Sequence, residues 1–214
     1  DFSCATIRVE YAVKAGFSSQ SQTDTGFFSL YTRLFKKSTE NFNELKGLSA
    51  ECNADSSRYV TSTTPSKISR TFSLLASAAF SPSFSDLLIK DELSELKTEV
   101  MQYAYTPAAF INASIDSRVF SASPWKHDSG IYPALFTKTS PAQARTILSR
   151  ISTGWYVPQN SALFISGCIK KDAALNLAKQ TFGQYEAAVS PQKARGAATG
   201  NKIHKFVLYD NDFS

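Results

Sequence analysis

Cysteine and histidine are common metal ligands and nucleophile or base residues, and this chain has few of either. Its three cysteines, Cys4, Cys52 and Cys168, lie too far apart for a short metal-ligand spacing, which favours small buried residues over a redox or metal role. The histidines His127 and His204 are equally isolated. The sequence contains neither a G-x-S-x-G elbow nor a glycine-rich phosphate loop, so these nucleophile and nucleotide motifs are excluded.

Glu92 and Glu99 are the charged pair whose spacing would best place two carboxylates side by side. Seven residues make two helical turns, so both carboxylates would project from the same helical face. The simpler explanation is an ordinary solvated face, because Glu92, Glu95 and Glu99 are interspersed with Lys90 and Lys97 along the same helix.

The composition is that of a globular protein with its own core. The 214 residues are 43% hydrophobic and 13% aromatic, and no apolar run is long enough to span a membrane. The net charge of +5 is spread thinly, with pairs such as Lys36–Lys37 as the longest basic runs, so no nucleic-acid partner is expected. The chain begins at Asp1 without a methionine. We expect export to the periplasm or envelope rather than a cytoplasmic location.

The elements that would position these residues follow from hydrophobic periodicity and turn signals. Strands do not alternate strictly with helices, which predicts an α+β fold with one mixed, largely antiparallel sheet packed by helices. We expect a domain over residues 1–186, a linker over 187–201 and the start of a following strand or second half-unit over 202–214. The predicted strands are Cys4–Ala15, Ser49–Ser56, Arg58–Thr64 and a buried strand Ala162–Ser166; the predicted helices are an aromatic one around Phe27–Phe35, a short one from Thr39 to Gly47, Pro65–Ser81, Ser85–Tyr105, one from Pro107 to Phe120 before a loop to Lys138, Ser140–Ser152 and Lys171–Thr181.

Five short patterns occur in a characteristic order along residues 5–185. They are the strand end Val13–Gly16, the aromatic helix opening at Thr25–Gly26, the hairpin pair Asn53–Ala54, the stretch Trp155–Gly167 and the pair Phe182–Gly183. Together they resemble an N-terminal-type half-unit of the insulinase or pitrilysin (inverzincin) metallopeptidases. Relatives in that family include the mitochondrial processing peptidase and the core proteins of respiratory complex III. The resemblance implies an α+β half-unit that faces a second half around a closed chamber.

The resemblance also implies a zinc motif, H-x-x-E-H, on the first helix, with two histidine ligands and a glutamate as general base. Aligned through Leu34–Phe35, this chain has Phe28 and Thr32 at the histidine positions and Tyr31 at the glutamate position. These side chains are poor ligands and a poor base, so no catalytic residue, no metal and no cofactor is predicted. We expect Phe28 and Tyr31 to be packed instead.

The family's third zinc ligand is a distal glutamate on a long helix. Glu99, seven residues after Glu92, is the remnant-ligand candidate at that position. The arginine and tyrosine with which second halves of the family grip substrate are replaced here by Asn43 and Ala50. This half is therefore expected to supply neither part of the catalytic apparatus.

The leading hypothesis is a catalytically inactive homologue acting as a structural or peptide-binding half, paired with an active subunit or a second insulinase-like domain. Unfolded peptides would add to a sheet edge among the strands Cys4–Ala15, Ser49–Ser56 and Arg58–Thr64, with Tyr59 lining the site. Two alternatives stay open: an assembly or scaffold protein without peptide binding, and a zinc metallopeptidase whose catalytic helix lies outside this fragment.

Overall fold

The computed structural model describes residues 6–185, apart from 22, 105, 110, 112–114, 116–118, 120–135 and 137. Short 3-10 turns connect several of the longer elements. The strands are β1 (Ile7–Val13), β2 (Ser49–Cys52), β3 (Ser57–Thr63) and β4 (Ser161–Gly167); the α-helices are α1 (Phe27–Thr39), α2 (Ile68–Phe80), α3 (Asp86–Ala104), α6 (Pro141–Trp155) and α7 (Lys171–Thr181); the 3-10 turns include η1 (Phe17–Ser19), η3 (Pro158–Asn160) and η4 (Phe182–Gln184).

The four strands form one sheet in the order β2-β3-β1-β4. β1 lies inside it and pairs antiparallel with β3 on one side and β4 on the other, so that Tyr11 stands between Tyr59 and Leu163. β2 pairs antiparallel with β3. The predicted α+β class is therefore confirmed, and every described pairing is antiparallel rather than mixed.

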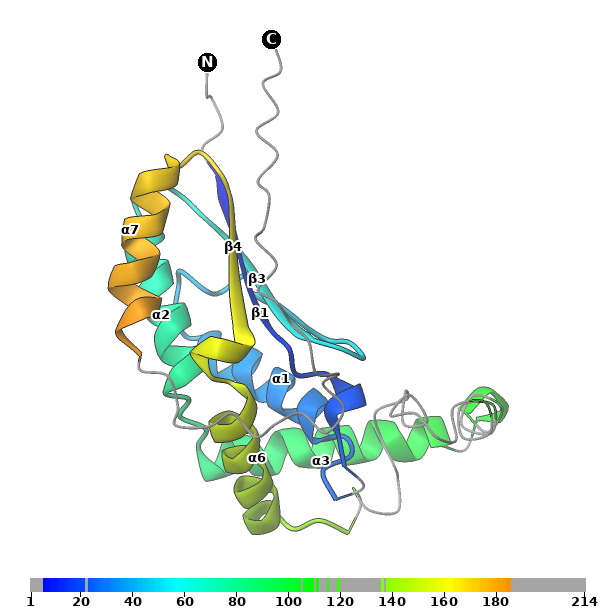
Figure 1. Ribbon diagram of the computed structural model, residues 1–214. Coiled ribbons are helices and arrows are strands. Elements are labelled where there is room, and N and C mark those ends of the chain that lie inside the picture. Colours follow the sequence, from blue (N-terminus) through cyan, green and yellow to red (C-terminus); the bar gives the residue numbers. More distant parts are fainter. Residues whose placement is uncertain are drawn as a thin grey trace.

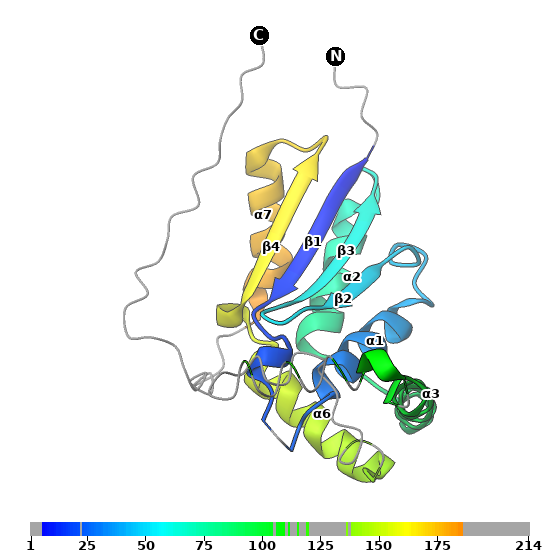
Figure 2. The same ribbon diagram turned by 90° about the vertical axis from the view of Figure 1, so that its right-hand side faces the viewer.

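The alternating sequence of β1 gives the sheet one buried and one open face. Ile7, Val9 and Tyr11 are buried, whereas Arg8 is exposed and Glu10 half-buried. Figures 1 and 2 show α2 and α7 against the buried face, with α1, α3 and α6 gathered towards the end at which β1 finishes. None of the described helices covers the open face, and none is long and apolar enough to cross a membrane.

Helix α6 shows local sequence signals setting an element boundary. Ser140 is its N-cap, Pro141 its first residue, and the Gln143 side chain completes a capping box with Ser140. Ala144, Leu148 and Ile151 then bury one stripe of the helix against the core. The predicted start at Ser140–Pro141 is confirmed, and the helix continues to Trp155.

Two sequence-based expectations are wrong. Thr39 does not cap a helix to Gly47: it is the last residue of α1, its hydroxyl donates to the Lys36 carbonyl at 2.8 Å, and isolated turns follow. A helix this short is marginal without an apolar face. β4 is not a buried strand either, because it lies at a sheet edge where Phe164 is 45% exposed.

The predicted linker 187–201 and strand 202–214 lie outside the described residues, as do most of the helix expected after Pro107 and the loop expected up to Lys138. The other predicted helices and strands are present, with ends shifted by a few residues.

Candidate functional site

Helix α1 begins after Gly26, whose backbone is left-handed with a φ of 87°. Glycine takes this conformation without the Cβ strain that other residues incur. The Gln20 side chain accepts a hydrogen bond from the Gly26 N–H, and the Gly26 carbonyl accepts one from the Leu30 N–H at 3.1 Å. This turn fixes the first residue of α1 and therefore the direction of each of its side chains.

Phe28, Tyr31 and Thr32, aligned above with the zinc motif, point into the core. Phe28 and Tyr31 are 0% exposed. The Phe28 ring meets Trp155 edge-on at a centroid distance of 5.7 Å, and the Tyr31 ring lies 4.1 Å from Tyr156. The Thr32 hydroxyl is buried and donates to the Phe28 carbonyl at 2.9 Å. The predicted packing of Phe28 and Tyr31 is confirmed.

A cluster of buried hydroxyl groups lies beside these side chains. The Tyr59 and Tyr156 hydroxyls are 2.6 Å apart, Tyr59 donates to Thr32 at 3.4 Å, and Thr32 lies 3.3 Å from the Ser57 hydroxyl. Burial raises the pKa of both Tyr59 and Tyr156 well above the usual value, so these phenols stay protonated at neutral pH. The Tyr31 hydroxyl is buried in the same region without a hydrogen-bond partner.

Tyr59 does not line an open face, contrary to the expectation from the sequence. Its side chain is 0% exposed and stacks on Phe35 of α1, with ring centroids 3.9 Å apart. Along β3 the residues that alternate with it, Arg58, Val60 and Ser62, face the uncovered side. A peptide lying on the sheet would meet those three residues instead.

A second face of α1 carries Ser29 and Arg33, four residues apart and both partly exposed. The Arg33 Nη2 lies 2.6 and 2.8 Å from the two carboxylate oxygens of Glu99 on α3. Both oxygens of the remnant-ligand candidate are thus engaged by one guanidinium. The sequence reasoning missed Arg33, because its place in a polar stripe with Ser29 and Lys36 indicates only a solvated face and not a contact with α3.

Glu92 behaves differently from Glu99, although both lie on α3. Only 6% of Glu92 is exposed. Burial, assisted by the negative charge of Glu95, raises the pKa of Glu92, while the positive charges of Lys37 and Arg33 act in the opposite direction. The two glutamates therefore meet α1 in different surroundings, one desolvated and one in an ion pair.

The side chains at the predicted zinc positions do not fit a zinc ion. Zinc takes cysteine, histidine and carboxylate donors. Phe28 offers no donor, the Thr32 hydroxyl is bonded to a backbone carbonyl, and Glu99 is held by Arg33. Among the residues that the structure describes, no three histidine, cysteine, aspartate or glutamate side chains gather. These positions supply neither the ligands nor the general base of a zinc peptidase.

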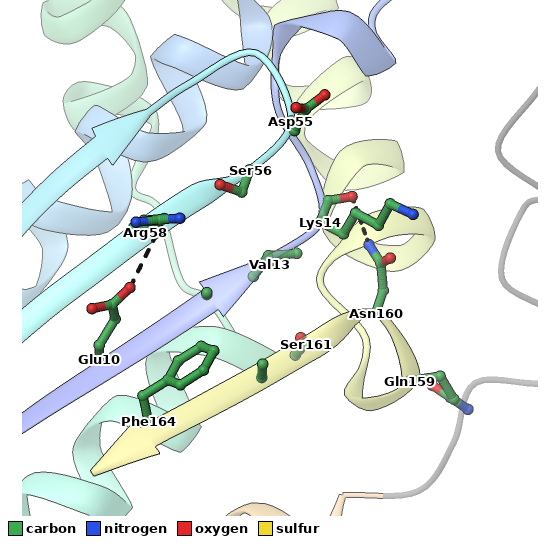
Figure 3. A pocket seen from close by; sticks show the side chains of 12 residues that line it. Glu10, Val13, Lys14, Asp55, Ser56, Arg58, Gln159, Asn160, Ser161 and Phe164 are labelled. Carbon is green, nitrogen blue, oxygen red and sulfur yellow. Dashed lines mark hydrogen bonds and ion pairs between the residues drawn. The ribbon is translucent and has the colours of Figure 1, made fainter. Parts of the chain in front are cut away.

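An open hollow of about 630 Å³ lies on the uncovered face of the sheet (Figure 3). Glu10 of β1, Arg58 of β3, Asp55 of the β2–β3 turn and Lys14 surround it, and Phe164 of β4 forms part of its apolar floor. The Arg58 Nε lies 3.9 Å from a Glu10 carboxylate oxygen. The hollow thus presents both charges beside an exposed aromatic ring.

Strand β4 forms one border of this hollow and one edge of the described sheet. The Lys14 N–H donates to the Asn160 carbonyl at 3.0 Å, which sets the phase of the β1–β4 ladder. Because bonded and non-bonded pairs alternate in an antiparallel ladder, Leu163 and Ile165 direct their backbone N–H and C=O groups away from β1. β1 and β3 are interior, so of the three strands expected to offer an edge only β2 does, and β4 offers the longer one.

No protein-family model and no curated protein sequence matches this chain. Solved structures do match. A protease from Helicobacter pylori matches with a TM-score of 0.73 and 15% identity, over 87% of this chain and 48% of that chain. The first half of the periplasmic protease PqqL from Escherichia coli matches with a TM-score of 0.68 and 14% identity, over 87% of this chain and 43% of that chain. A chain of complex III2 from Candida albicans, with Inz-5 bound, matches with a TM-score of 0.66 and 15% identity, over 91% of this chain and 45% of that chain.

At these identities the likeness shows the fold alone. Proteases and a complex III chain are the kinds of protein to which the sequence patterns pointed, so the expected fold is confirmed. The chain spans less than half the length of each matched chain.

Proposed function

We propose that this chain is a catalytically silent half-unit of a peptidase fold, which pairs with a second domain or subunit and holds extended peptides against its sheet. One observation carries the proposal. Helix α1, on which the zinc motif would lie, carries no histidine in any alignment: Phe28, Tyr31 and Thr32 are turned into the core, and Arg33 engages Glu99. Removing metal ligands and base together leaves binding and assembly as the activities that this fold can still perform.

The pairing is supported by the matched structures. One of them is the first half of the protease PqqL, and another belongs to complex III2. A half-unit with one uncovered sheet face has a surface suited to a second layer. The periplasmic location of the PqqL protease also supports an exported location for this chain.

Peptide binding is supported by the edge and the hollow. Outward backbone groups at Leu163 and Ile165 can pair with an extended chain without any catalytic residue. Phe164, 45% exposed, offers apolar contact. Lys14 and Arg58 can pair with acidic groups on a peptide, and Glu10 and Asp55 with basic groups. From one half alone the affinity should be weak, with a Kd on the order of 0.1–1 mM, because the second half that orders the peptide is absent.

A titration of unfolded peptides against isotope-labelled protein, followed by NMR, tests this function. Chemical shift changes should cluster on β4 and the hollow. Phe164→Ala should weaken binding several-fold. Phe42→Ala, at another exposed phenylalanine (39%) that lies between α1 and β2 and does not line the hollow, should not. Equal binding by both variants, or shifts elsewhere, would remove the peptide-binding role.

The silent part of the proposal has its own test. Protein prepared without chelator should contain no stoichiometric zinc and should not cleave peptides. One zinc ion per chain, with hydrolysis that a chelator stops, would contradict the proposal directly.

An assembly role without peptide binding is the second candidate, and the match to a complex III chain favours it. A titration without shifts, together with stable association with a partner domain, is the result that it predicts.

A further inference from the structure

The two faces of α1 differ in whether their side chains are accessible to a metal ion. A zinc site that admits water and substrate needs ligands on an accessible face that also meets the third ligand. Phe28 and Thr32 are buried, whereas Ser29 and Arg33 are partly exposed, and it is Arg33 that meets Glu99. An alignment of the motif shifted by one residue would place its two ligand positions on this partly exposed face of α1.

In the shifted alignment Ser29 and Arg33 take the two histidine positions and Thr32 takes the position of the base. Ser29 and Arg33 are four residues apart and so lie on one helical face, as two ligands must. Thr32 is buried, so only the two ligand positions, and not the position of the base, lie on the partly exposed face.

We propose that the guanidinium of Arg33 stands in the place of the metal ion, joining α1 to α3 through Glu99. This inference rests on the proposed function and identifies the residues that replaced the catalytic centre. One nitrogen, Arg33 Nη2, contacts both carboxylate oxygens of Glu99, at 2.6 and 2.8 Å, so a single positively charged group is shared by the two oxygens. The positive charge of Arg33 on α1 thereby attracts Glu99 on α3, as a metal ion bound between the two helices would.

The lengths of the side chains agree with this substitution. An imidazole plus one Zn–N bond of about 2.0–2.1 Å reaches roughly as far from the helix as an arginine side chain does. A metal held by histidines at positions 29 and 33 would therefore lie close to the present guanidinium. Glu99 would be within reach without any movement of α3.

The double variant Ser29→His/Arg33→His tests the inference on the whole chain. It should bind one zinc ion per chain, measured by calorimetry and metal analysis, while the original protein binds none. Adding Glu99→Gln to this variant should abolish stoichiometric binding. The matched variant Phe28→His/Thr32→His places the same two histidines in the buried alignment and should bind no zinc.

Circular dichroism establishes that each variant is folded. A folded double variant that binds no zinc, or one that keeps its zinc after Glu99→Gln, overturns the inference. If the double variant does not fold, Arg33→His alone gives the decision: its zinc affinity should exceed that of the original protein at least tenfold, and Glu99→Gln should remove the gain. Zinc in the original protein would instead contradict the proposed function.

Discussion

Replacing Tyr31 with phenylalanine should leave this protein at least as stable as it is, whereas the same change at Tyr59 should destabilise it. Both side chains are 0% exposed and lie in the same aromatic cluster. They differ in their hydroxyl groups. Tyr59 lies 2.6 Å from the Tyr156 hydroxyl, while the Tyr31 hydroxyl has no partner: Ser152 is near enough to influence its pKa but not in hydrogen-bond geometry.

The magnitudes follow from this difference. A buried polar group without a partner costs about 1–3 kcal/mol, so Tyr31→Phe should change the free energy of unfolding by between zero and a gain of about 1 kcal/mol. Tyr59→Phe removes the hydrogen bond between the Tyr59 and Tyr156 hydroxyls and leaves the buried Tyr156 hydroxyl without this partner. The free energy of unfolding should fall by about 1–3 kcal/mol. Urea unfolding followed by circular dichroism measures both variants. At a slope near 2 kcal/mol/M, the two midpoints should differ by about 0.5–2 M.

An equal loss of stability in both variants would refute the reasoning, because it would mean that the Tyr31 hydroxyl is hydrogen-bonded in the folded protein. A change in the slope for Tyr31→Phe would point to altered packing instead.

Three further predictions concern a turn, a thiol and a carboxyl. Gly16→Ala should cost more than about 2 kcal/mol, because its Cβ would lie 2.2 Å from the Asn53 carbonyl oxygen, while Gly47→Ala, with open space around it, should change stability by less than about 1 kcal/mol by urea unfolding. Burial raises the pKa of the Cys52 thiol, so iodoacetamide should label Cys52 more slowly at pH 8 in the folded protein than in urea, and equal rates by mass spectrometry would contradict this. The pKa of the Glu92 carboxyl is higher in the folded protein, so the protonated carboxyl favours folding, and this contribution to stability is lost as the pH rises through the folded pKa. Glu92→Gln, which stays uncharged, should therefore raise the urea midpoint at pH 7. Below about pH 4 the original carboxyl is protonated as well, and the two midpoints should be equal.

Elements with a strong local period could be predicted from the sequence. The alternation in Ile7–Val13 and the Ser140–Pro141 start are local signals, and both led to the correct element. The open edge could not be predicted, because the residues of a strand do not reveal its place in the sheet order. Ser161–Gly167 has the sequence of a buried strand and yet lies at an edge. The helix predicted from Thr39 to Gly47 was wrong for a related reason, since a single capping residue does not provide the buried stripe that a short helix requires.

The candidate site shows the same limit. That the zinc motif is degenerate is visible in the sequence, but which face of α1 meets α3 is not. Arg33 and Glu99 are 66 residues apart, and their contact depends on how two helices cross. An alignment through Leu34–Phe35 rests on similar residue types and carries no information on which stripe of α1 is accessible.

The position of β1 between β3 and β4 has a consequence for how this protein is made. Ile7 pairs with Thr63 on one side and with Gly167 on the other. At roughly 5–20 residues per second, β4 leaves the ribosome on the order of 5–20 s after β3. A β1–β3 ribbon that forms within that interval leaves the backbone groups of Arg8, Glu10 and Ala12, which later pair with β4, open to other strands. The order of elements along the chain therefore creates a period of vulnerability during synthesis that ends when Ser161–Gly167 is added.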